Sequence, residues 1–345
     1  MKKPYIIAEI GVNYYDIAKT QNISLMEAAK IMVNEAKKSG ASAVKFQSYK
    51  AEKIASKNSP SYWDTTKEPT TNQYDLFKKF DSFGESEYII LSHYCNEIGI
   101  DFMSTPFDLE SVDYLDPLVK LHKISSSDIT NTPLIRKIAK TKKKILLSTG
   151  ASTNEEIQDA LDIIEKEGNS DVVLLHCILN YPTENKNANL NMIENLKNFN
   201  KEVGYSDHTL PDEGMLILTQ AVMMGSSYIE KHFTLDKSLP GNDHYHAMDP
   251  KDLLKFASNL ELLLEIGGST LKTPLDTEEI SRKNARRSVY LKNNLKKGTI
   301  LTKEHLICKR PAHGISAKEF DYIIGKELKL DIKKDIALQW EMILN

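Results

Sequence analysis

The sequence predicts a (β/α)8 TIM barrel followed by a small, separate β-rich domain. Eight short strand-like runs each precede a helical or helix-containing segment, which is the order of elements in a parallel barrel. These runs are YIIAEI, SAVKFQ, DFMST, LHKIS, KILLST, DVVLLHC, EVGYSD and SYIEKH. After the helical stretch DLLKFASNLELLLEIGG, short strands separated by KKG and PAHG turns follow. We expect a barrel domain at residues 1–270, a linker at 271–285 and a small domain at 286–345.

Local signals predict where the helices between these strands begin. Ser24 with Glu27, and Thr153 with Glu156, fit the capping box, and Pro133 suits a first helical turn. Two connections are longer than a barrel usually needs, namely NYYDIAKTQN after the first strand and residues 51 to 73 after the second. We expect both to be loops above the strand ends, where barrel enzymes carry their chemistry.

Composition and charge exclude several classes of function. The net charge of -3 arises from interspersed acids and bases without a basic stripe, so no nucleic-acid partner is expected. The opening MKKPYIIAEIG is interrupted by Glu9 and is too short for a signal peptide or membrane span, which favours a cytoplasmic protein. Cys95, Cys177 and Cys308 are widely spaced and form neither a zinc motif nor a disulfide framework, so we interpret them as reduced thiols.

Two histidines close consecutive predicted strands and indicate a metal site. His208 follows the run VGYSD and His232 ends YIEKH. Adjacent parallel strands lie about 4.8 Å apart, so both rings should emerge at one end of the sheet. Alone, either histidine is more often a hydrogen-bonded core or surface residue. Their pairing at equivalent strand ends favours ligands of a divalent transition metal.

The other predicted strand ends carry groups suited to an anion beside a metal. Lysines supply charge, and serine and threonine hydroxyls supply directional donors to phosphate or carboxylate oxygens. A single strand lysine is usually solvent-facing, but barrel strands are covered on both faces, so two such lysines need a ligand or a counter-ion. The set at the strand ends is Glu9, Lys45, Gln47, Thr105, Lys123, Ser126, Ser148, Ser206, His208 and His232.

At these residues the chain resembles the sialic acid synthase family. The motifs are AEIGVN, VKFQSYKAE, FMSTPFDLESVDYL, KISSSDITNTPLI, ILLSTGAST, LLHCILNYPT, VGYSDHT, IEKHFTLDKSLPGNDH and KRPAHGIS, in chain order and over nearly the whole chain. The resemblance implies a (β/α)8 barrel followed by an antifreeze-like SAF domain of β-clip fold. It also implies an enzyme that joins phosphoenolpyruvate to an N-acetylated amino sugar and releases phosphate, making a nine-carbon nonulosonic acid.

The resemblance further implies a role for each strand-end residue. His208 and His232 would hold a divalent ion, Mn²⁺ first, with Mg²⁺ or Co²⁺ as alternatives, and Glu9 would handle a water or hydroxyl proton. The residues implied for phosphoenolpyruvate are Lys45, Thr105, Lys123, Ser126, Ser148 and Ser206. Those implied for the amino sugar are Gln47, Phe107, Asp128, Tyr181, Asp243 and Arg310. Arg310 would come from the terminal domain of the partner in a domain-swapped homodimer.

Three departures from the family pattern bear on the choice of sugar. Tyr14 stands in the first connection where relatives commonly have histidine, and Asp128 stands where many have glutamate. The segment 178–180, Ile-Leu-Asn, replaces more polar residues, and such an apolar wall could favour a deoxy sugar or an extra acyl group. The motifs SDHT and LDKSLPGNDH are closer to the sialic and legionaminic branches than to the pseudaminic branch.

Two other functions remain open from the sequence. One is a different phosphoenolpyruvate-condensing barrel that makes a shorter 3-deoxy-ulosonic acid, although such enzymes do not usually carry the terminal domain. The other is a non-catalytic carbohydrate-binding relative with a decayed barrel. The presence of both histidines, both lysines and Glu9 argues against decay.

Overall fold

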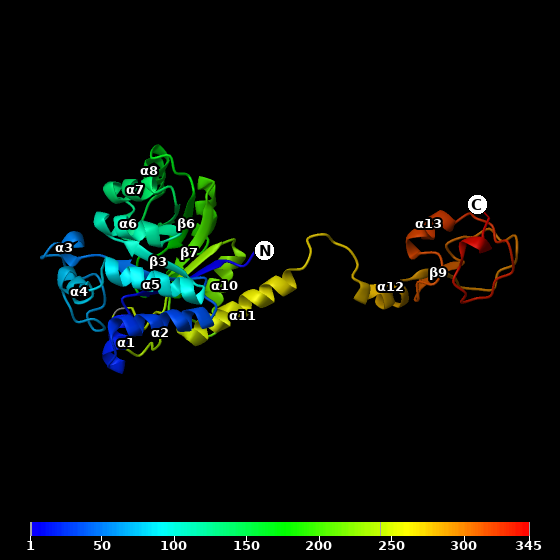
Figure 1. Cartoon of the computed structure of the whole chain (residues 1–345). Coiled ribbons are helices and arrows are strands. Elements are labelled where there is room, and N and C mark those ends of the chain that lie inside the picture. The colour runs from blue at the N-terminus through cyan, green and yellow to red at the C-terminus, as the bar shows by residue number, and fades with distance from the viewer. Residues whose placement is uncertain (1, 242, 345) are drawn as a thin grey trace. The chain divides into compact units, whose positions relative to one another are not determined.

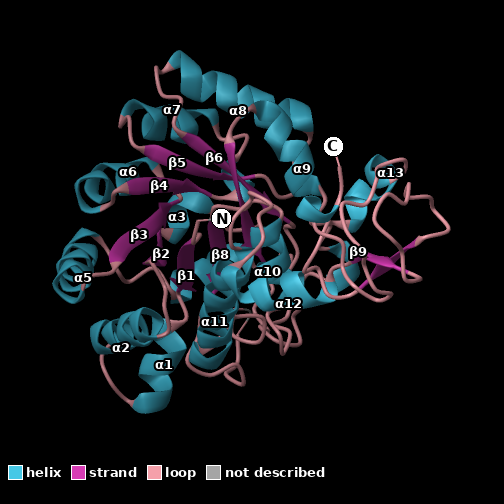
Figure 2. Cartoon of the chain, turned by 90° about the vertical axis from the view of Figure 1, so that its right-hand side faces the viewer, coloured by secondary structure: helices cyan, strands magenta, loops and turns pink. Residues whose placement is uncertain are grey.

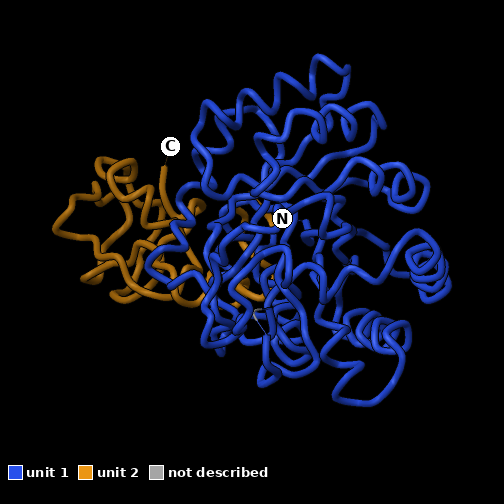
Figure 3. The backbone as a smooth tube through the Cα atoms, turned by 90° about the vertical axis from the view of Figure 1, so that its left-hand side faces the viewer, with its two compact units in different colours: residues 1–268 blue, residues 269–345 orange. Residues whose placement is uncertain are grey.

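The computed structural model describes residues 2–241 and 243–344. These residues fall into two compact units, one ending at Gly268 and the other beginning at Ser269 (Figure 3). Each unit has its own hydrophobic core. In the described residues no helix is long and apolar enough to cross a membrane.

The first unit is the predicted barrel. Its eight parallel strands are β1 (Tyr5–Gly11), β2 (Ala43–Ser48), β3 (Asp101–Pro106), β4 (Leu121–Ile124), β5 (Lys144–Ser148), β6 (Val172–Cys177), β7 (Glu202–Asp207) and β8 (Tyr228–His232). Hydrogen bonds join them in the order β3-β2-β1-β8-β7-β6-β5-β4, and Cα atoms of β3 and β4 lie within 8 Å of one another. The sheet therefore curls into a nearly closed ring with the strands inside and helices outside (Figure 2).

Helices follow each strand and cover the outside of the ring (Figure 1). The α-helices are α1 (Tyr14–Gln21), α2 (Leu25–Lys38), α3 (Ala51–Ile54), α4 (Gln73–Lys79), α5 (Glu85–Ile98), α6 (Leu109–Leu115), α7 (Thr132–Lys140), α8 (Asn154–Lys166), α9 (Met192–Leu196), α10 (Leu216–Met223) and α11 (Pro250–Gly267). Short 3-10 turns are η1 (Asp116–Leu118), η2 (Ser126–Asp128), η3 (Asn185–Asn187) and η4 (Lys197–Phe199).

The predicted helix starts are confirmed. The hydroxyl of Ser24 accepts a hydrogen bond from the backbone of Glu27 at the start of α2. Thr153 and Glu156 form a reciprocal capping box at the start of α8. Pro133 lies in the first turn of α7, where its missing N–H has no intrahelical partner to lose.

The first long connection is helical, so the expectation of a loop there is wrong. Tyr14–Gln21 forms α1, and its buried residues Tyr14 and Ile17 pack into the main core. Tyr14 lies against Phe46 and Phe83, with ring centroids 5.8 Å and 4.8 Å away. Aromatic packing of this kind outweighs the weak helix propensity of tyrosine. The second connection contains only the short helix α3 before α4 begins at Gln73.

The second unit is small and rich in β-structure. Its elements are η5 (Asp276–Glu278), α12 (Glu279–Ala285), β9 (Ser288–Leu291), β10 (Leu306–Lys309), η6 (Ala317–Glu319), α13 (Phe320–Ile323) and η7 (Trp340–Met342). β9 and β10 pair antiparallel, and isolated bridges such as Tyr290 with Ala337 extend the pairing. The core residues include Val289, Leu301 and Leu338.

Candidate active site

The inward-facing residues of the barrel form two layers. Residues two apart on a strand share a face, so the interior can be read along each strand. An apolar cluster contains Ile7, Ala43, Met103, Leu121, Leu146, Val173 and Leu175. Two residues further along five of these strands stand Glu9, Lys45, Thr105, Lys123 and Ser148. An apolar layer thus closes the barrel beneath a polar layer at the carboxyl ends of the strands, where barrel enzymes place their chemistry.

Buried charges of both signs meet in the polar layer. Lys45 Nζ lies 2.5 Å from Glu9 Oε2 and 3.7 Å from Glu230 Oε2, and it donates a hydrogen bond of 3.0 Å to Thr105 Oγ1. Lys123 Nζ lies 3.2 Å from the other oxygen of Glu230. All four charged residues are at most 5% exposed. Two lysines and two carboxylates therefore balance one another out of contact with bulk water.

The pKa values of the Glu9 and Glu230 carboxyl groups are shifted in opposite directions by their surroundings. Burial and the charge of Glu230 raise the pKa of Glu9, in spite of the attraction of Lys45. Against the effect of burial, Lys123 and Lys45 lower the pKa of Glu230 to about 2. Although burial opposes it, the charges of Glu230 and Glu9 raise the pKa of Lys45. Glu230 is thus a fixed anion, whereas Glu9 is the carboxyl group suited to gain and lose a proton.

Serine hydroxyls border these charges. Ser206 donates a hydrogen bond of 3.0 Å to Glu230 Oε1, and the Gly150 backbone N–H donates one of 3.0 Å to Ser126 Oγ. Ser148 Oγ is buried and has no hydrogen-bond partner among the described residues. A buried hydroxyl in that position can donate to a ligand oxygen without giving up another contact.

A cavity of about 480 Å³ opens beside the polar layer. Its lining includes the predicted residues Gln47, Phe107, Ser126, Asp128, Tyr181, His232 and Asp243. Much of the remaining wall is apolar or aromatic, with Ile54, Tyr62, Trp63, Leu76, Phe77, Phe80 and Leu179. The long connection between β2 and α5 supplies six of these seven wall residues, so it does lie over the strand ends as expected.

The two predicted metal ligands lie close together, with ring centroids of His208 and His232 5.7 Å apart. His208 Nδ1 lies 2.7 Å from the carbonyl oxygen of Ile178, to which it donates, so Nε2 is the nitrogen with a lone pair. His232 Nδ1 is buried without a hydrogen-bond partner among the described residues. Burial, with the neighbouring His246 and His208, lowers the pKa of His232, and a neutral imidazole is the form that binds metals.

His232 also belongs to a possible metal-binding triad. One ligand atom from each of His232, Asp243 and His246 lies within 4.8 Å of the other two. Imidazole and carboxylate donors in one place suit divalent first-row transition metals. The residues present therefore fit a divalent ion.

Arg310 is the one predicted site residue outside the first unit. It follows β10 in the second unit and is exposed. Two residues of the candidate site were not predicted, Glu230 in the polar layer and His246 beside His232. Glu230 stands two residues before His232 on β8, so strand alternation could have found it. His246 follows an irregular segment, and its sequence position alone does not indicate where its ring lies.

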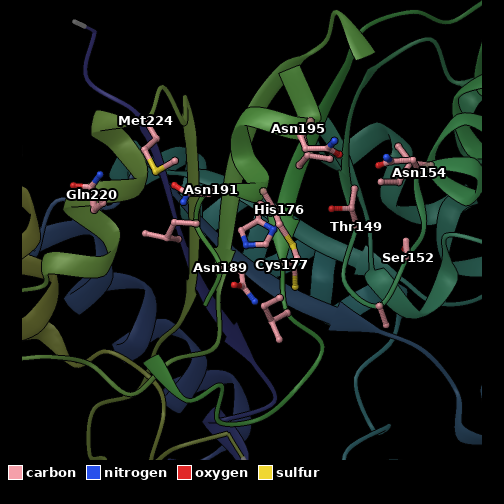
Figure 4. A pocket seen from close by; sticks show the side chains of 16 residues that line it. Thr149, Ser152, Asn154, His176, Cys177, Asn189, Asn191, Asn195, Gln220 and Met224 are labelled. Carbon is pink, nitrogen blue, oxygen red and sulfur yellow. The ribbon is translucent and has the colours of Figure 1, made fainter. Parts of the chain in front are cut away.

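A second cavity of about 790 Å³ lies outside the polar layer (Figure 4). Side chains from α8, α9 and α10 line it, together with His176 and Cys177 from β6. His176 is held there by a hydrogen bond of 2.8 Å between Nε2 and the carbonyl oxygen of Ala188. The described residues that line this cavity include none of the predicted site residues, so it is not part of the candidate active site.

A parallel eight-stranded barrel that gathers buried lysines, carboxylates and histidines at the carboxyl ends of its strands defines the class of (β/α)8-barrel enzymes. Comparison with known proteins narrows this class. The chain belongs to the NeuB family, which residues 32–272 match. Residues 286–344 match the SAF domain, so the antifreeze-like module expected from the sequence is confirmed.

Characterised relatives extend over almost the whole chain. It is 40% identical to the N,N'-diacetyllegionaminic acid synthase of Legionella pneumophila, over 98% of this chain and 94% of that protein. It is 39% identical to the Campylobacter jejuni enzyme of the same name, over 97% and 98%. Among solved structures, the N-acetylneuraminic acid synthetase of Leptospira borgpetersenii, in complex with citrate, superposes with a TM-score of 0.68 at 32% identity. That alignment covers 81% of this chain and 90% of the synthetase.

Proposed function

We propose that this enzyme is a nonulosonic acid synthase that condenses phosphoenolpyruvate with an N-acetylated amino sugar and water, releasing phosphate. The amino sugar is N-acetylmannosamine or a 2,4-diacetamido-2,4,6-trideoxyhexose, giving N-acetylneuraminate or a legionaminate-type acid. One observation carries the proposal: buried Lys45 and Lys123 share the polar layer with Glu9 beside a cavity large enough for a sugar. Membership of the NeuB family and the named relatives support it.

Phosphoenolpyruvate presents a phosphate and a carboxylate, and the polar layer offers cations and hydroxyl donors to both. Lys45 and Lys123 neutralise the ligand, each exchanging part of its contact with Glu9 or Glu230 for a ligand oxygen. The proposed donors are Lys45, Thr105, Lys123, Ser126, Ser148 and Ser206. The buried hydroxyl of Ser148 is the clearest of these, because it has no hydrogen-bond partner among the described residues.

The reaction forms one carbon–carbon bond. Carbon 3 of phosphoenolpyruvate attacks the aldehyde carbon of the open-chain sugar, and the aldehyde oxygen takes up a proton to become a hydroxyl. Water adds to the cation that forms at carbon 2 and loses one proton, which balances the proton taken up by the aldehyde oxygen. The bond from carbon 2 to the bridging phosphate oxygen then breaks, and the second water proton leaves with the phosphate as the carbon 2 hydroxyl becomes the ketone. Glu9 accepts the proton of that water, because its carboxylate lies in the polar layer with a raised pKa. The barrel excludes bulk water from this site, which limits side reactions of the cation.

A divalent ion is part of the proposal, with Mn²⁺ first and Mg²⁺ or Co²⁺ as alternatives. His232 and His208 are the proposed ligands, since both rings face the same region and are 5.7 Å apart. When bound, the ion supplies Lewis-acid polarisation of the sugar aldehyde. The protein prepares this site by keeping the His232 imidazole neutral through burial.

The cavity wall bears on which sugar is preferred. Gln47, Asp128 and Asp243 offer polar contacts to hydroxyl and amide groups, while Phe107 and Tyr181 offer ring faces. The apolar wall from the β2–α5 connection matches the methyl groups of a diacetamido-trideoxy sugar better than a hydroxyl-rich chain. Higher identity to the legionaminic relatives than to the N-acetylneuraminic synthetase points the same way. We therefore place the diacetamido sugar first.

Assembly and organisation complete the proposal. The barrel domain comprises residues 1–270, a linker 271–285 and an antifreeze-like domain 286–345, in line with the family matches. Arg310 of one subunit reaches the sugar site of its partner in a domain-swapped homodimer. The enzyme works in the cytoplasm, in keeping with its three free cysteines.

The test is a substrate panel with purified protein. Mn²⁺, phosphoenolpyruvate and one sugar are combined, with N-acetylmannosamine, its 6-phosphate and diacetamido-trideoxyhexoses tried in turn, and phosphate release and product mass are measured. A nine-carbon keto acid from the diacetamido sugar is the expected product. Equal turnover of N-acetylmannosamine would refute the preference but keep the activity. Absence of phosphate release with every sugar would refute the activity.

A further inference from the structure

The segment between β8 and α11 folds back beside the end of β8. Phe233 and Met248 form an isolated parallel bridge, in which the Met248 N–H donates to the carbonyl oxygen of His232 at 2.8 Å. The Thr234 N–H donates to the carbonyl oxygen of Met248 at 3.0 Å. These backbone hydrogen bonds hold the returning chain against the strand end. His246, two residues before Met248, is thereby placed next to His232.

His244 anchors the same segment from the other side. Its Nδ1 lies 2.7 Å from Thr234 Oγ1, and its Nε2 lies 3.2 Å from Asp16 Oδ2 on α1. His244 is therefore engaged through both ring nitrogens in holding the segment. Asp243, directly before His244, and His246, two residues after it, each bring a possible ligand atom close to His232 instead.

The three side chains have the spacing of a preformed ligand set. His232 Nδ1 lies 3.7 Å from Asp243 Oδ2, and the rings of His232 and His246 have centroids 4.8 Å apart and planes inclined at 62°. Donors that share an ion at about 2.1 Å each lie about 3 Å apart when they occupy neighbouring positions. Rotations about side-chain bonds that move the donors by about 1 Å would therefore close the set. His246 is fully buried, so packing limits its ring to small movements of this kind.

We propose that Asp243 and His246, with His232, are the protein ligands that define the divalent ion site. The inference rests on the proposed function, which needs an ion at His232, and adds to it two ligands that the sequence did not predict. Two imidazoles and one carboxylate leave the remaining coordination positions open. His208 lies at the edge of the set, with its ring centroid 6.5 Å from that of His246, and can add Nε2.

This ligand set has a consequence for selectivity among metals. Imidazole nitrogen suits first-row transition metals, whereas Mg²⁺ prefers a shell of carboxylate, carbonyl and water oxygens. Two nitrogen ligands and a single carboxylate therefore favour Mn²⁺ or Co²⁺ over Mg²⁺. Asp243 also lines the cavity, so its carboxylate lies where a sugar would bind.

Binding of Mn²⁺ alone to the full chain tests the ligand set without using activity. Free Mn²⁺ is followed by electron paramagnetic resonance during titration of the wild type and of His246→Gln, Asp243→Asn, His232→Gln and His208→Gln. Tyr245→Phe is the matched control, since it alters the same segment outside the ligand set. We expect His246→Gln and Asp243→Asn to weaken Mn²⁺ binding at least about tenfold, as for other disturbed metal sites. Tyr245→Phe should bind as the wild type does.

The outcomes separate this inference from the proposed function. Weaker binding in His232→Gln and His208→Gln, with His246→Gln unchanged, would overturn the inference and leave the ion between the two predicted histidines. Wild-type binding in all four variants, or no Mn²⁺ binding by the wild type, would overturn the ion site of the proposed function as well. Phosphate release by the wild type without Mn²⁺ binding would leave the synthase activity standing alone.

A second variant guards against simple misfolding of His246→Gln. His246→Asp retains a ligand atom, so it should bind Mn²⁺ more tightly than His246→Gln and bind Mg²⁺ better, relative to Mn²⁺, than the wild type. A purely structural role for His246 predicts that aspartate is no better than glutamine, which would overturn the inference. Thermal unfolding with and without Mn²⁺ checks each variant, because a bound ion raises the melting temperature of a folded protein.

Discussion

Lys231 and Asp207 form a buried ion pair that joins the last two strands of the barrel. Lys231 Nζ lies 2.6 Å from Asp207 Oδ2, both side chains are 1% exposed, and the two residues face each other in the register of β7 and β8. Each is followed directly by a histidine, His208 just past the end of β7 and His232 as the last residue of β8. The pair therefore fixes the strand register at the point where the two imidazoles enter the site.

Removal of the charge of Asp207 should destabilise the fold. Asp207→Asn leaves the buried Lys231 without its counter-charge, and such a loss lowers the free energy of unfolding by about 3–5 kcal/mol. Urea unfolding of the metal-free protein measures this. The control Glu194→Gln breaks an exposed pair with Lys197 and should change stability by less than about 1 kcal/mol. Equal effects of the two substitutions would contradict the role given to the buried pair.

Substitution of Glu9 should abolish turnover while leaving the fold intact. Glu9→Gln keeps the shape of the side chain and its contact with Gln47, but it cannot accept a proton. We expect kcat to fall about 10²–10⁴-fold, the usual contribution of a general base. Steady-state kinetics and the melting temperature measure the two effects separately. A variant that kept wild-type kcat would show that another group handles the proton.

Gly150 is a position where a side chain cannot fit without moving a site residue. A Cβ there would lie 2.8 Å from Ser126 Oγ and 3.2 Å from Cys177 Sγ. Gly150→Ala should therefore displace the Ser126 hydroxyl and raise KM for phosphoenolpyruvate by about tenfold, as expected for a lost hydrogen bond to a charged group. In the control Gly214→Ala, the new Cβ meets its nearest atom at 3.5 Å, an ordinary contact, and kinetics should not change. An unaltered KM in Gly150→Ala would argue against Ser126 as a ligand of phosphoenolpyruvate.

His122 should make stability depend on pH. Burial lowers its pKa below the ordinary value of 6.5, although Asp116 Oδ1, 3.0 Å from Nε2, opposes the shift. As the pH falls below 6.5, the unfolded chain binds a proton that the folded protein does not bind, so stability is lost in that direction. His122→Gln removes this contribution, so its stability relative to the wild type should improve from about pH 7.5 to about pH 5.5. Urea unfolding at several pH values measures the difference, and a constant difference would contradict the prediction.

Complementation between two inactive variants tests the swapped homodimer. Arg310→Ala and Glu9→Gln should each be inactive alone. Mixed dimers formed by unfolding and refolding the two together pair an intact barrel with an intact Arg310, so about a quarter of the sites should recover activity. A mixture that stays inactive, although mixed dimers are detected by mass, would contradict a site shared between subunits.

The fold was predictable because its signals are local and repeated. The alternation of strand and helix, the caps at Ser24 and Thr153, and the change of pattern after α11 each depend on a few adjacent residues. The polar and aromatic sequence of the first connection predicts a loop, although the segment is helical. What makes it helical is the packing of Tyr14 against Phe46 and Phe83, which are distant in the sequence.

The site was predictable where strand periodicity places residues, and less so elsewhere. Lys45 and Glu9 lie side by side because parallel strands align their carboxyl ends. Glu230 follows the same rule and was predictable from strand alternation, but it is not among the predicted site residues. The position of His246 depends on the hydrogen bonds of Met248 to a strand end, and such a long-range backbone contact leaves no local pattern in the sequence.

The sharing of Lys45 between two carboxylates couples anion capture to proton movement. The ammonium group of Lys45, 2.5 Å from Glu9, favours the ionised form of that carboxyl group, while Glu230 has Lys123 as a second partner. An incoming anion that attracts Lys45 would weaken its contact with Glu9, and the affinity of Glu9 for a proton would then increase. Binding of the anion would thus make Glu9 a stronger base at the stage at which it has to accept a proton.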